Sequence, residues 1–289
     1  MENTQPLPNL LTEQRMTDAW ADVLKQPADS SVLKPSAHRL AFADPEFLLR
    51  REARGIRIQL EMLKPDLDQS AQGIHNTVVV FGSARFVSPE QAQEQLMQAG
   101  DDPQAKTVAQ RHVRNAQHYE HARQFAHLVA NYSDGLPAEQ RLYVCTGGGP
   151  GIMEAANRGA HEARAPTIGL NIALPHEQHA NPYVTPSLSF KFHYFAMRKM
   201  HFMIRAKALV AFPGGFGTLD ELFEVITLVQ TKKAQPVPIV LFGSSYWKRL
   251  LNFEAMVEEG VIAPEDLNLL HFVDEPQVAW DVIARFYRL

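Results

Sequence analysis

The stretch that most constrains this chain is PGGFGTLDE at residues 213–221, because a glycine-rich segment there separates two apolar runs. Residues 208–212, ALVAF, are predicted to form a buried strand, and residues 222–229, LFEVITLV, are predicted to form a helix. A glycine turn between a strand and a helix presents free backbone N–H groups and a helix N-terminus to an anion. The motif therefore predicts a phosphate-binding turn.

Each residue type in the motif has a physical reason to be there. A side chain would block a phosphate from reaching the backbone, so we expect phosphate contacts at Gly214, Gly215 and Gly217. Thr218 is expected either to cap the helix or to donate its hydroxyl to the ligand. Asp220 and Glu221 would lie in the first turn, where acids stabilise the helix dipole. Since a carboxylate repels a phosphate, the pairing also favours a site that acts on a cationic centre beside the anion.

Two other predicted strands, residues 77–81 and 142–145, also end in glycine turns. The candidate substrate-binding residues in these turns are Gly82, Ser83, Gly147, Gly148 and Gly149. Three such turns after neighbouring strands are a stronger indication of a phosphate site than one turn alone. A nucleotide or sugar phosphate is the expected occupant.

Strand and helix patterns alternate along the chain, which is typical of an α/β protein with a doubly wound, Rossmann-like parallel sheet. The expected strands are residues 77–81, 142–145, 166–172, 208–212, 237–243 and 269–273. A strand order of 3-2-1-4-5 would put the loops after the first and fourth strands at the switch point, where such sheets bind ligands. We therefore expect all three glycine turns to open on one crevice.

Residues 1–74 are expected to form a helical N-terminal extension to a nucleotide-binding catalytic domain of residues 75–289. One short helix is predicted over residues 13–24, and Asp44 followed by proline predicts the start of another. This second helix would carry the apolar stripe Leu49, Ala53, Ile56, Leu60 and Leu63. Packing on the main domain and contact with a second subunit both explain the stripe. Residues 89–105 are expected to form a surface insertion of broken helix.

Charge and composition exclude several classes of protein. The net charge is -4 with acids and bases mixed along the chain, so we expect neither a nucleic-acid nor a membrane surface. No apolar run approaches the length of a membrane span and the first residues lack a signal-peptide pattern, so a cytoplasmic location is expected. The lone Cys145 is expected to be a buried, inert thiol. His176 and His179 miss the spacing of a zinc protease helix, so no metal site is expected.

Taken together, the motifs resemble those of the LOG (Lonely Guy) family of nucleoside 5'-monophosphate phosphoribohydrolases, whose members were often labelled "lysine decarboxylase". Residues 213–221 match PGGxGTxxE, Met197-Arg198-Lys199 resembles the RK element that precedes it, and residues 146–154 resemble the second glycine loop. The resemblance covers residues 75–245. It implies cleavage of the N-glycosidic bond of AMP or a cytokinin riboside 5'-monophosphate to a free base and ribose 5-phosphate, without a cofactor.

The resemblance also implies site residues and an assembly. Arg198 and Glu221 correspond to the family's catalytic pair, and an assembly of at least a homodimer with sites near the subunit interface is implied. A carboxylate near the anomeric carbon would stabilise an oxocarbenium-like ribose or orient water, and Arg198 would keep it ionised. On spacing alone, Arg198 equally fits a helix-face ion pair. Lys199 and Glu224 are further candidates for substrate binding, with a helix-face position as the alternative for Glu224.

Other functions are considered beside this one. A non-catalytic nucleotide-binding or sensing protein of the same fold would keep the glycine turns and leave Arg198 and Glu221 idle. A dinucleotide-dependent oxidoreductase is expected to carry GxGxxG in its first turn, whereas residues 82–85 read GSAR. A pyridoxal phosphate enzyme needs a Schiff-base lysine, for which Lys199 and Lys207 qualify only by location.

Overall fold

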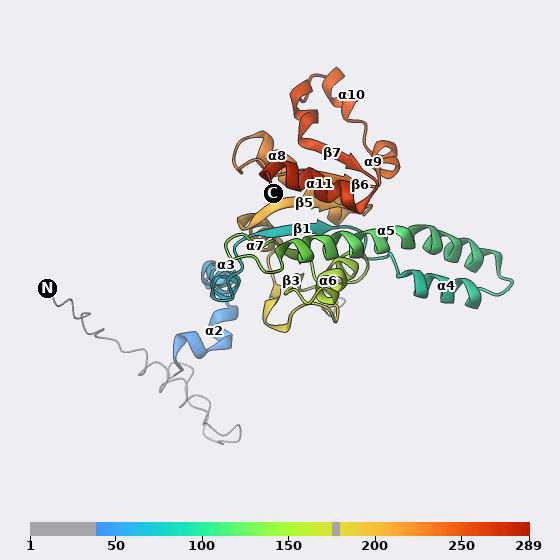
Figure 1. Cartoon of the computed structure of the whole chain (residues 1–289). Helices are drawn as coiled ribbons and strands as arrows, with labels where there is room; N and C mark the ends of the chain where they lie inside the picture. Colours follow the sequence, from blue (N-terminus) through green and yellow to red (C-terminus); the bar gives the residue numbers. More distant parts are fainter. Residues whose placement is uncertain (1–38, 175–179) are drawn as a thin grey trace. The chain divides into compact units, whose positions relative to one another are not determined.

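The computed structural model describes residues 39–174 and 180–289, and the chain divides into two compact units, Met1–Leu60 and Glu61–Leu289. Within those described ranges, seven strands form one sheet, and all of its pairings are parallel (Figure 1). The strands are β1 Thr77–Phe81, β2 Tyr143–Thr146, β3 Ile168–Ile172, β4 Ser189–Phe192, β5 Ala206–Ala211, β6 Ile239–Phe242 and β7 Leu270–Val273.

The sheet order is β4-β3-β2-β1-β5-β6-β7, so the doubly wound sheet and the predicted order of its five central strands are confirmed. Strand β4, which pairs with β3 at the edge of the sheet, was not predicted. Its residues alternate between exposed and buried, with Lys191 among the exposed ones, and so they lack the continuous apolar run of a central strand. The predicted strand at residues 269–273 is β7, at the opposite edge.

Helices follow most of the strands in the unit Glu61–Leu289. They are α4 Pro89–Gln98, α5 Pro103–Ser133, α6 Ile152–Glu162, α7 Phe195–Ile204, α8 Phe216–Gln230, α9 Ser244–Leu250, α10 Phe253–Glu258 and α11 Pro276–Tyr287, with two short 3-10 helices, η3 Pro186–Leu188 and η4 Pro264–Leu269. Successive strand residues face opposite sides of the sheet. In β1, Val78 and Val80 therefore join a core with α5, α6 and α11, whereas Val79 and Phe81 join a core with α7 and α8.

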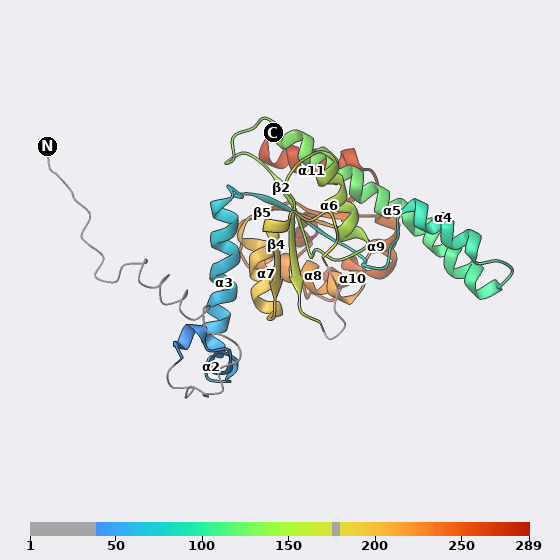
Figure 2. The ribbon, with the colours of Figure 1, turned by 90° about the horizontal axis from the view of Figure 1, so that it is seen from below.

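The predicted insertion of broken helix is a pair of helices, α4 and the first turns of α5, which projects beyond the sheet (Figure 2). Ser88 and Gln91 form a capping box at the start of α4, and Asp102 caps the start of α5. The chain turns between them at residues 99–102. These capping residues explain why the helix is broken into α4 and α5 at this point.

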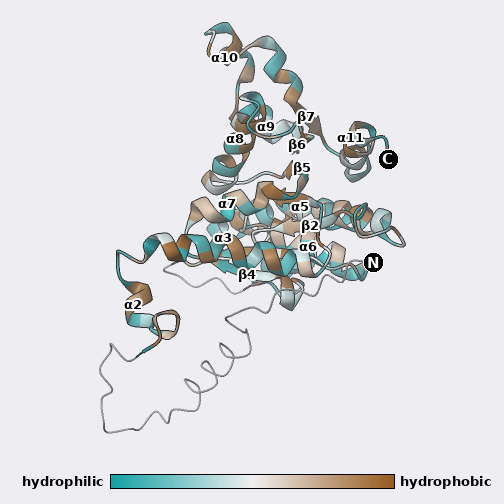
Figure 3. Ribbon diagram, turned by 90° about the vertical axis from the view of Figure 1, so that its left-hand side faces the viewer, coloured by the Kyte–Doolittle hydropathy of each residue, from teal (hydrophilic) through white to brown (hydrophobic). Residues whose placement is uncertain are grey.

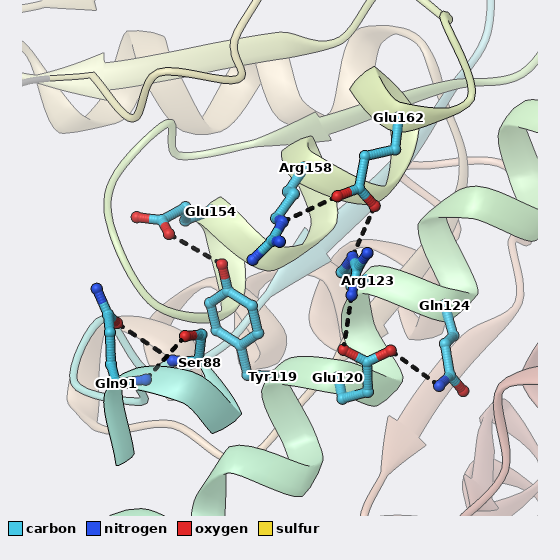
Figure 4. Close-up of polar contacts among 9 residues, drawn as sticks. All are labelled: Ser88, Gln91, Tyr119, Glu120, Arg123, Gln124, Glu154, Arg158 and Glu162. Atoms are coloured by element: carbon cyan, nitrogen blue, oxygen red, sulfur yellow. Dashed lines mark hydrogen bonds and ion pairs between the residues drawn. The ribbon is translucent and has the colours of Figure 1, made fainter. Parts of the chain in front are cut away.

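Helices α5 and α6 pack closely because Gly159 has no side chain at their contact. A Cβ on Gly159 would lie 2.0 Å from the carbonyl oxygen of Arg123. Around this contact, Arg123 pairs with Glu162 at 2.6 Å, and Glu162 also pairs with Arg158 at 2.9 Å (Figure 4). The hydroxyl of Tyr119 donates to Glu154 at 2.9 Å in the first turn of α6. These bonds fix the helix that follows the second glycine turn.

In the unit Met1–Leu60, Asp44 caps α2 Pro45–Leu49, as predicted, by accepting from the backbone N–H groups of Glu46 and Phe47 at 3.0 and 3.2 Å. The expectation of a single helix from residue 45 to 63 is wrong. The backbone is extended at Arg50, and α3 begins at Arg54 and runs to Ala71. The guanidinium of Arg57 donates to the carbonyl oxygens of Leu48 and Arg50, which compensates for the early end of α2.

Helix α3 carries alternating hydrophobic and hydrophilic bands (Figure 3). Its large apolar side chains that are about half exposed are Ile56, Leu60, Leu63 and Leu67. Its buried residues are instead Pro65 and Gln69. Of the predicted apolar stripe, Leu49, Ile56, Leu60 and Leu63 are thus left exposed by the described residues, whereas Ala53 is buried.

Some of the predictions fall on residues that the structure does not describe. These are the helix predicted over residues 13–24 and the histidines at 176 and 179. Within the part of the chain that is described, no helix has both the length and the apolar character needed to cross a membrane. The predicted boundary between residues 1–74 and 75–289 stays a prediction. Cys145 is buried, as expected.

Candidate functional site

The three glycine turns line one cavity of about 660 Å³ at the carboxyl ends of the strands. Its volume is that of a site for a small organic ligand. The predicted site residues that line it are Gly82, Ser83, Gly147, Arg198, Gly214, Gly215, Gly217, Thr218 and Glu221. Of the described candidates, Gly148, Gly149, Lys199 and Glu224 are not among its lining residues.

Arg198 and Glu221 meet in the wall of this cavity. Arg198 comes from α7, before β5, and Glu221 comes from α8, after β5, and Arg198 Nη2 donates to Glu221 Oε1. The side chains are only 12% and 8% exposed, so water screens the pair weakly. An exposed helix-face ion pair, the alternative for Arg198, does not describe this geometry.

The surroundings of Glu221 raise its pKa above the ordinary value. Burial is the largest cause, because it disfavours the charged carboxylate. The charge of Arg198 and its hydrogen bond oppose that effect and lower the pKa. The carboxylate therefore depends on the guanidinium for its ionised form.

The glycine-rich motif at residues 213–221 folds differently at one point from the expectation. Helix α8 begins at Phe216, five residues before Glu221, with Gly215 as its N-cap. Thr218 lies inside the helix, so it is not the cap, and its side chain instead packs on Gly214. A Cβ on Gly214 would lie 2.1 Å from Thr218 Oγ1, and only glycine fits there. Apart from the adjoining residues and the nearby backbone of α8, no atom of the described residues lies within 4 Å of a Cβ built on Gly215 or Gly217.

The turn is also held from outside. The hydroxyl of Tyr246, in α9, donates to the carbonyl oxygen of Gly214 at 2.5 Å, and the Tyr246 ring lines the cavity. Burial raises the pKa of Tyr246, so its hydroxyl remains a donor at neutral pH. The sequence offered no motif around Tyr246, only its place shortly after the strand next to β5.

The second glycine turn is supported by a buried polar network. Thr146 Oγ1 accepts from the N–H of Gly148 at 2.9 Å and donates to Asn157 Oδ1 at 2.7 Å. Asn181 Nδ2 donates to Asn157 Oδ1 and to the carbonyl oxygen of Gly149. Gly148 has a φ of +69°, which favours glycine. Gly148 and Gly149 thus shape the turn that presents Gly147 to the cavity.

Lys199 and Glu224 pair with each other beside the cavity. Lys199 Nζ lies 2.8 Å from Asp220 and 3.0 Å from Glu224. The carboxylates of these partners are 56% and 36% exposed. This is the geometry of the helix-face alternative, and it links α7 to α8.

Several apolar side chains that the sequence analysis did not single out complete the cavity. They are Met153, Ile172, Leu174, Phe195, Phe202, Phe216 and Leu250. Phe216 is 92% exposed, although it lies within the motif itself. Isolated aromatic residues have no sequence signature, so only the fold brings them to the site. In the described ranges, no group of three His, Cys, Asp or Glu side chains is arranged to hold a metal ion.

Comparison with known proteins agrees with the motifs. Residues 153–283, somewhat less than half of the chain, match the family model described as "Possible lysine decarboxylase". Two cytokinin riboside 5'-monophosphate phosphoribohydrolases of Arabidopsis thaliana, both LOG proteins, are 31% and 32% identical over 130 and 124 residues. The chain is similar to LOG proteins over less than half of its length. The predicted resemblance is confirmed.

The matches to these LOG proteins cover 44% and 42% of this chain, and the chain spans little more than half of their length, 58% and 56%. Among solved structures, the molybdenum cofactor binding protein of Rippkaea orientalis is similar over 73% of this chain and 97% of its own. Its identity is 17% and its TM-score is 0.45. A molybdenum cofactor carrier protein of Chlamydomonas reinhardtii has 20% identity and a TM-score of 0.43, covering 74% of this chain and 99% of its own.

Proposed function

We propose that this protein hydrolyses the N-glycosidic bond of a nucleoside 5'-monophosphate. The bond between the ribose C1' and the base nitrogen breaks, water adds its hydroxyl to C1', and a proton goes to the base. The products are a free base and ribose 5-phosphate. The observation that carries the proposal is the buried Arg198–Glu221 pair in a cavity lined by three glycine turns. The relation to the LOG phosphoribohydrolases supports it.

The phosphate would bind at the start of α8. Gly215 and Gly217 leave room for an anion beside the backbone, and the N–H groups of the first helical turn are free to donate. Glu221 lies farther along the same helix and also faces the cavity. A phosphate anchored at the helix start would thus place the attached ribose near the carboxylate.

Glu221 would act on the ribose. Departure of the base leaves positive charge on C1' and the ring oxygen, which a carboxylate stabilises more in the transition state than in the ground state. The same carboxylate would orient the attacking water and take its proton. Because Glu221 is only 8% exposed, its charge acts with little screening by solvent.

Arg198 would keep Glu221 in the form that the reaction needs. Its charge opposes the effect of burial on the Glu221 pKa, and its hydrogen bond fixes the position of the carboxylate. Its Nε is buried and has no hydrogen-bond partner among the described residues. This N–H is a donor that a ribose or phosphate oxygen of the substrate would satisfy.

The test is a product assay with a panel of nucleoside 5'-monophosphates that includes AMP and a cytokinin riboside 5'-monophosphate. We expect free base and ribose 5-phosphate from at least one of them, and far slower cleavage of the matching nucleoside. Equal cleavage of AMP and adenosine would contradict phosphate binding by the glycine turns. Tight binding of a nucleotide with no cleavage of any in the panel would instead support the non-catalytic nucleotide-binding protein.

A further inference from the structure

The guanidinium of Arg198 lies between two phenylalanine rings of its own helix. Its central carbon is 5.0 Å from the ring centroid of Phe195 and 5.6 Å from that of Phe202. Positions three before and four after a residue share its side of a helix, so α7 itself creates this arrangement. All three side chains line the cavity. Both distances are within the range of a cation–π contact.

The two rings are held very differently. Phe202 is 2% exposed, and its ring meets Phe81, at the end of β1, edge to face with a centroid distance of 4.8 Å. Phe195 is the first residue of α7 and is 49% exposed. The Phe202 ring beside the guanidinium therefore belongs to the core, whereas the Phe195 ring lies at the edge of the cavity.

Few polar contacts hold Arg198 in place. Nη2 donates to Glu221, while Nε is buried without a hydrogen-bond partner among the described residues. A planar guanidinium stacks well on an aromatic face and remains charged when it does so. Such a contact strengthens when water is excluded, and the Arg198 side chain is 12% exposed.

We propose that Phe195 is a positioning residue: its ring holds the Arg198 guanidinium against Glu221 from the open side of the cavity. The inference rests on the proposed function for its effect on rate, but the contact itself is independent of it. Leucine at residue 195 would fill much of the same space but lacks the electron-rich face of the aromatic ring. The ring, and not only apolar bulk, is what the structure assigns to this position.

The first experiment compares Phe195→Leu and Phe195→Tyr with the full-length wild-type protein on its best nucleotide, across pH. Because Arg198 lowers the Glu221 pKa, a looser guanidinium moves the acidic limb of the kcat/KM profile to higher pH. We expect this movement in Phe195→Leu, with kcat/KM lower by about twofold to thirtyfold, and recovery in Phe195→Tyr. Phe286→Leu, a change at a phenylalanine that is 47% exposed and outside the cavity lining, is the matched control.

A change in KM alone, with the acidic limb unmoved in Phe195→Leu, would show that Phe195 only contacts substrate and would overturn the proposal. So would equal behaviour of the leucine and tyrosine variants. The same pH movement in Phe286→Leu would also overturn it, because that residue does not touch the pair.

The second experiment does not depend on activity. Unfolding by denaturant is measured for wild type, Phe195→Leu, Arg198→Met and the double variant. If the two side chains are in contact, the effects of the two substitutions should not be additive. The unfolding equilibrium constant of the double variant should differ by about twofold to thirtyfold from the value expected if the two single effects were independent. No coupling would refute the contact. Coupling in a protein that cleaves no nucleotide would uphold the contact while the proposed function fails.

Discussion

Replacing Glu221 by glutamine separates charge from shape in the proposed catalytic pair. Glutamine keeps an oxygen that accepts from Arg198 Nη2, so the α7–α8 contact survives. What is lost is one negative charge in a site where the side chain is 8% exposed. At an effective dielectric constant of about 20, a charge about 4 Å from the developing cation contributes about 4 kcal/mol. That corresponds to a factor of about 10³ in rate.

We therefore expect Glu221→Gln to lower kcat by about 10²–10⁴-fold, with a much smaller change in KM. The loss falls on kcat because the interaction strengthens as C1' becomes cationic. Steady-state kinetics on the best nucleotide measure it, with product detection sensitive enough for the slow variant. If Glu221→Gln keeps kcat within a few-fold of wild type, the carboxylate is a structural charge and the mechanism is wrong.

The same variant gives a pH test that needs no substrate. Because the folded-state pKa of Glu221 is raised, the folded protein keeps a proton that the unfolded chain has already lost. Stability from this group is therefore present at low pH and is lost as pH rises through the folded-state pKa. Denaturant unfolding across pH should show that loss in wild type and not in Glu221→Gln. Identical pH dependence of unfolding in the two proteins would mean that burial does not raise the pKa of the Glu221 carboxyl.

The remaining predictions concern the glycine turn, Lys199 and the apolar side chains of α3. Gly215→Ala should fold normally and raise KM, because a Cβ there would meet nothing beyond the adjoining residues but would occupy the path of the phosphate. Gly214→Ala should instead lower the melting temperature, because a Cβ there would clash with Thr218. Lys199→Ala should change kcat by less than about tenfold, since this residue does not line the cavity. A loss of kcat as large as that of Glu221→Gln would show that Lys199 takes part in the reaction. Leu63→Asp should lower the molar mass measured by light scattering if α3 joins two subunits, and an unchanged mass would favour the alternative of packing within one chain.

Much of the fold was predictable because several central strands contain continuous apolar runs with a glycine turn soon after. β1 and residues 208–211 of β5 are such runs, and Gly82 and Gly214, which follow them, line the cavity. β4 escaped prediction because half of its side chains face solvent. The start of α8 was placed too late, since Gly215 and Gly217 are poor helix formers and concealed a helix that begins at Phe216.

The site was predictable only as far as motifs reach. Arg198 and Lys199 were both predicted as site residues because they form one sequence element, but adjacent residues on a helix point in different directions. Arg198 faces Glu221 in the cavity, while Lys199 turns to Asp220 and Glu224. Phe195 and Tyr246 were not predicted, because their roles depend on contacts with residues that the sequence does not mark.

The order of the strands also affects how this protein emerges from the ribosome. β1 lies at the centre of the sheet, between β2 and β5, and Val78 pairs with both Val144 and Ala208. β5 begins 125 residues after the end of β1, so at about 5–20 residues per second it is synthesised roughly 6 to 25 seconds later. During that interval β1 keeps an unpaired, apolar edge, which is the feature that recruits other strands in aggregation. The nascent chain therefore stays prone to aggregation until β5, the strand before the glycine turn at residues 213–217, has been made.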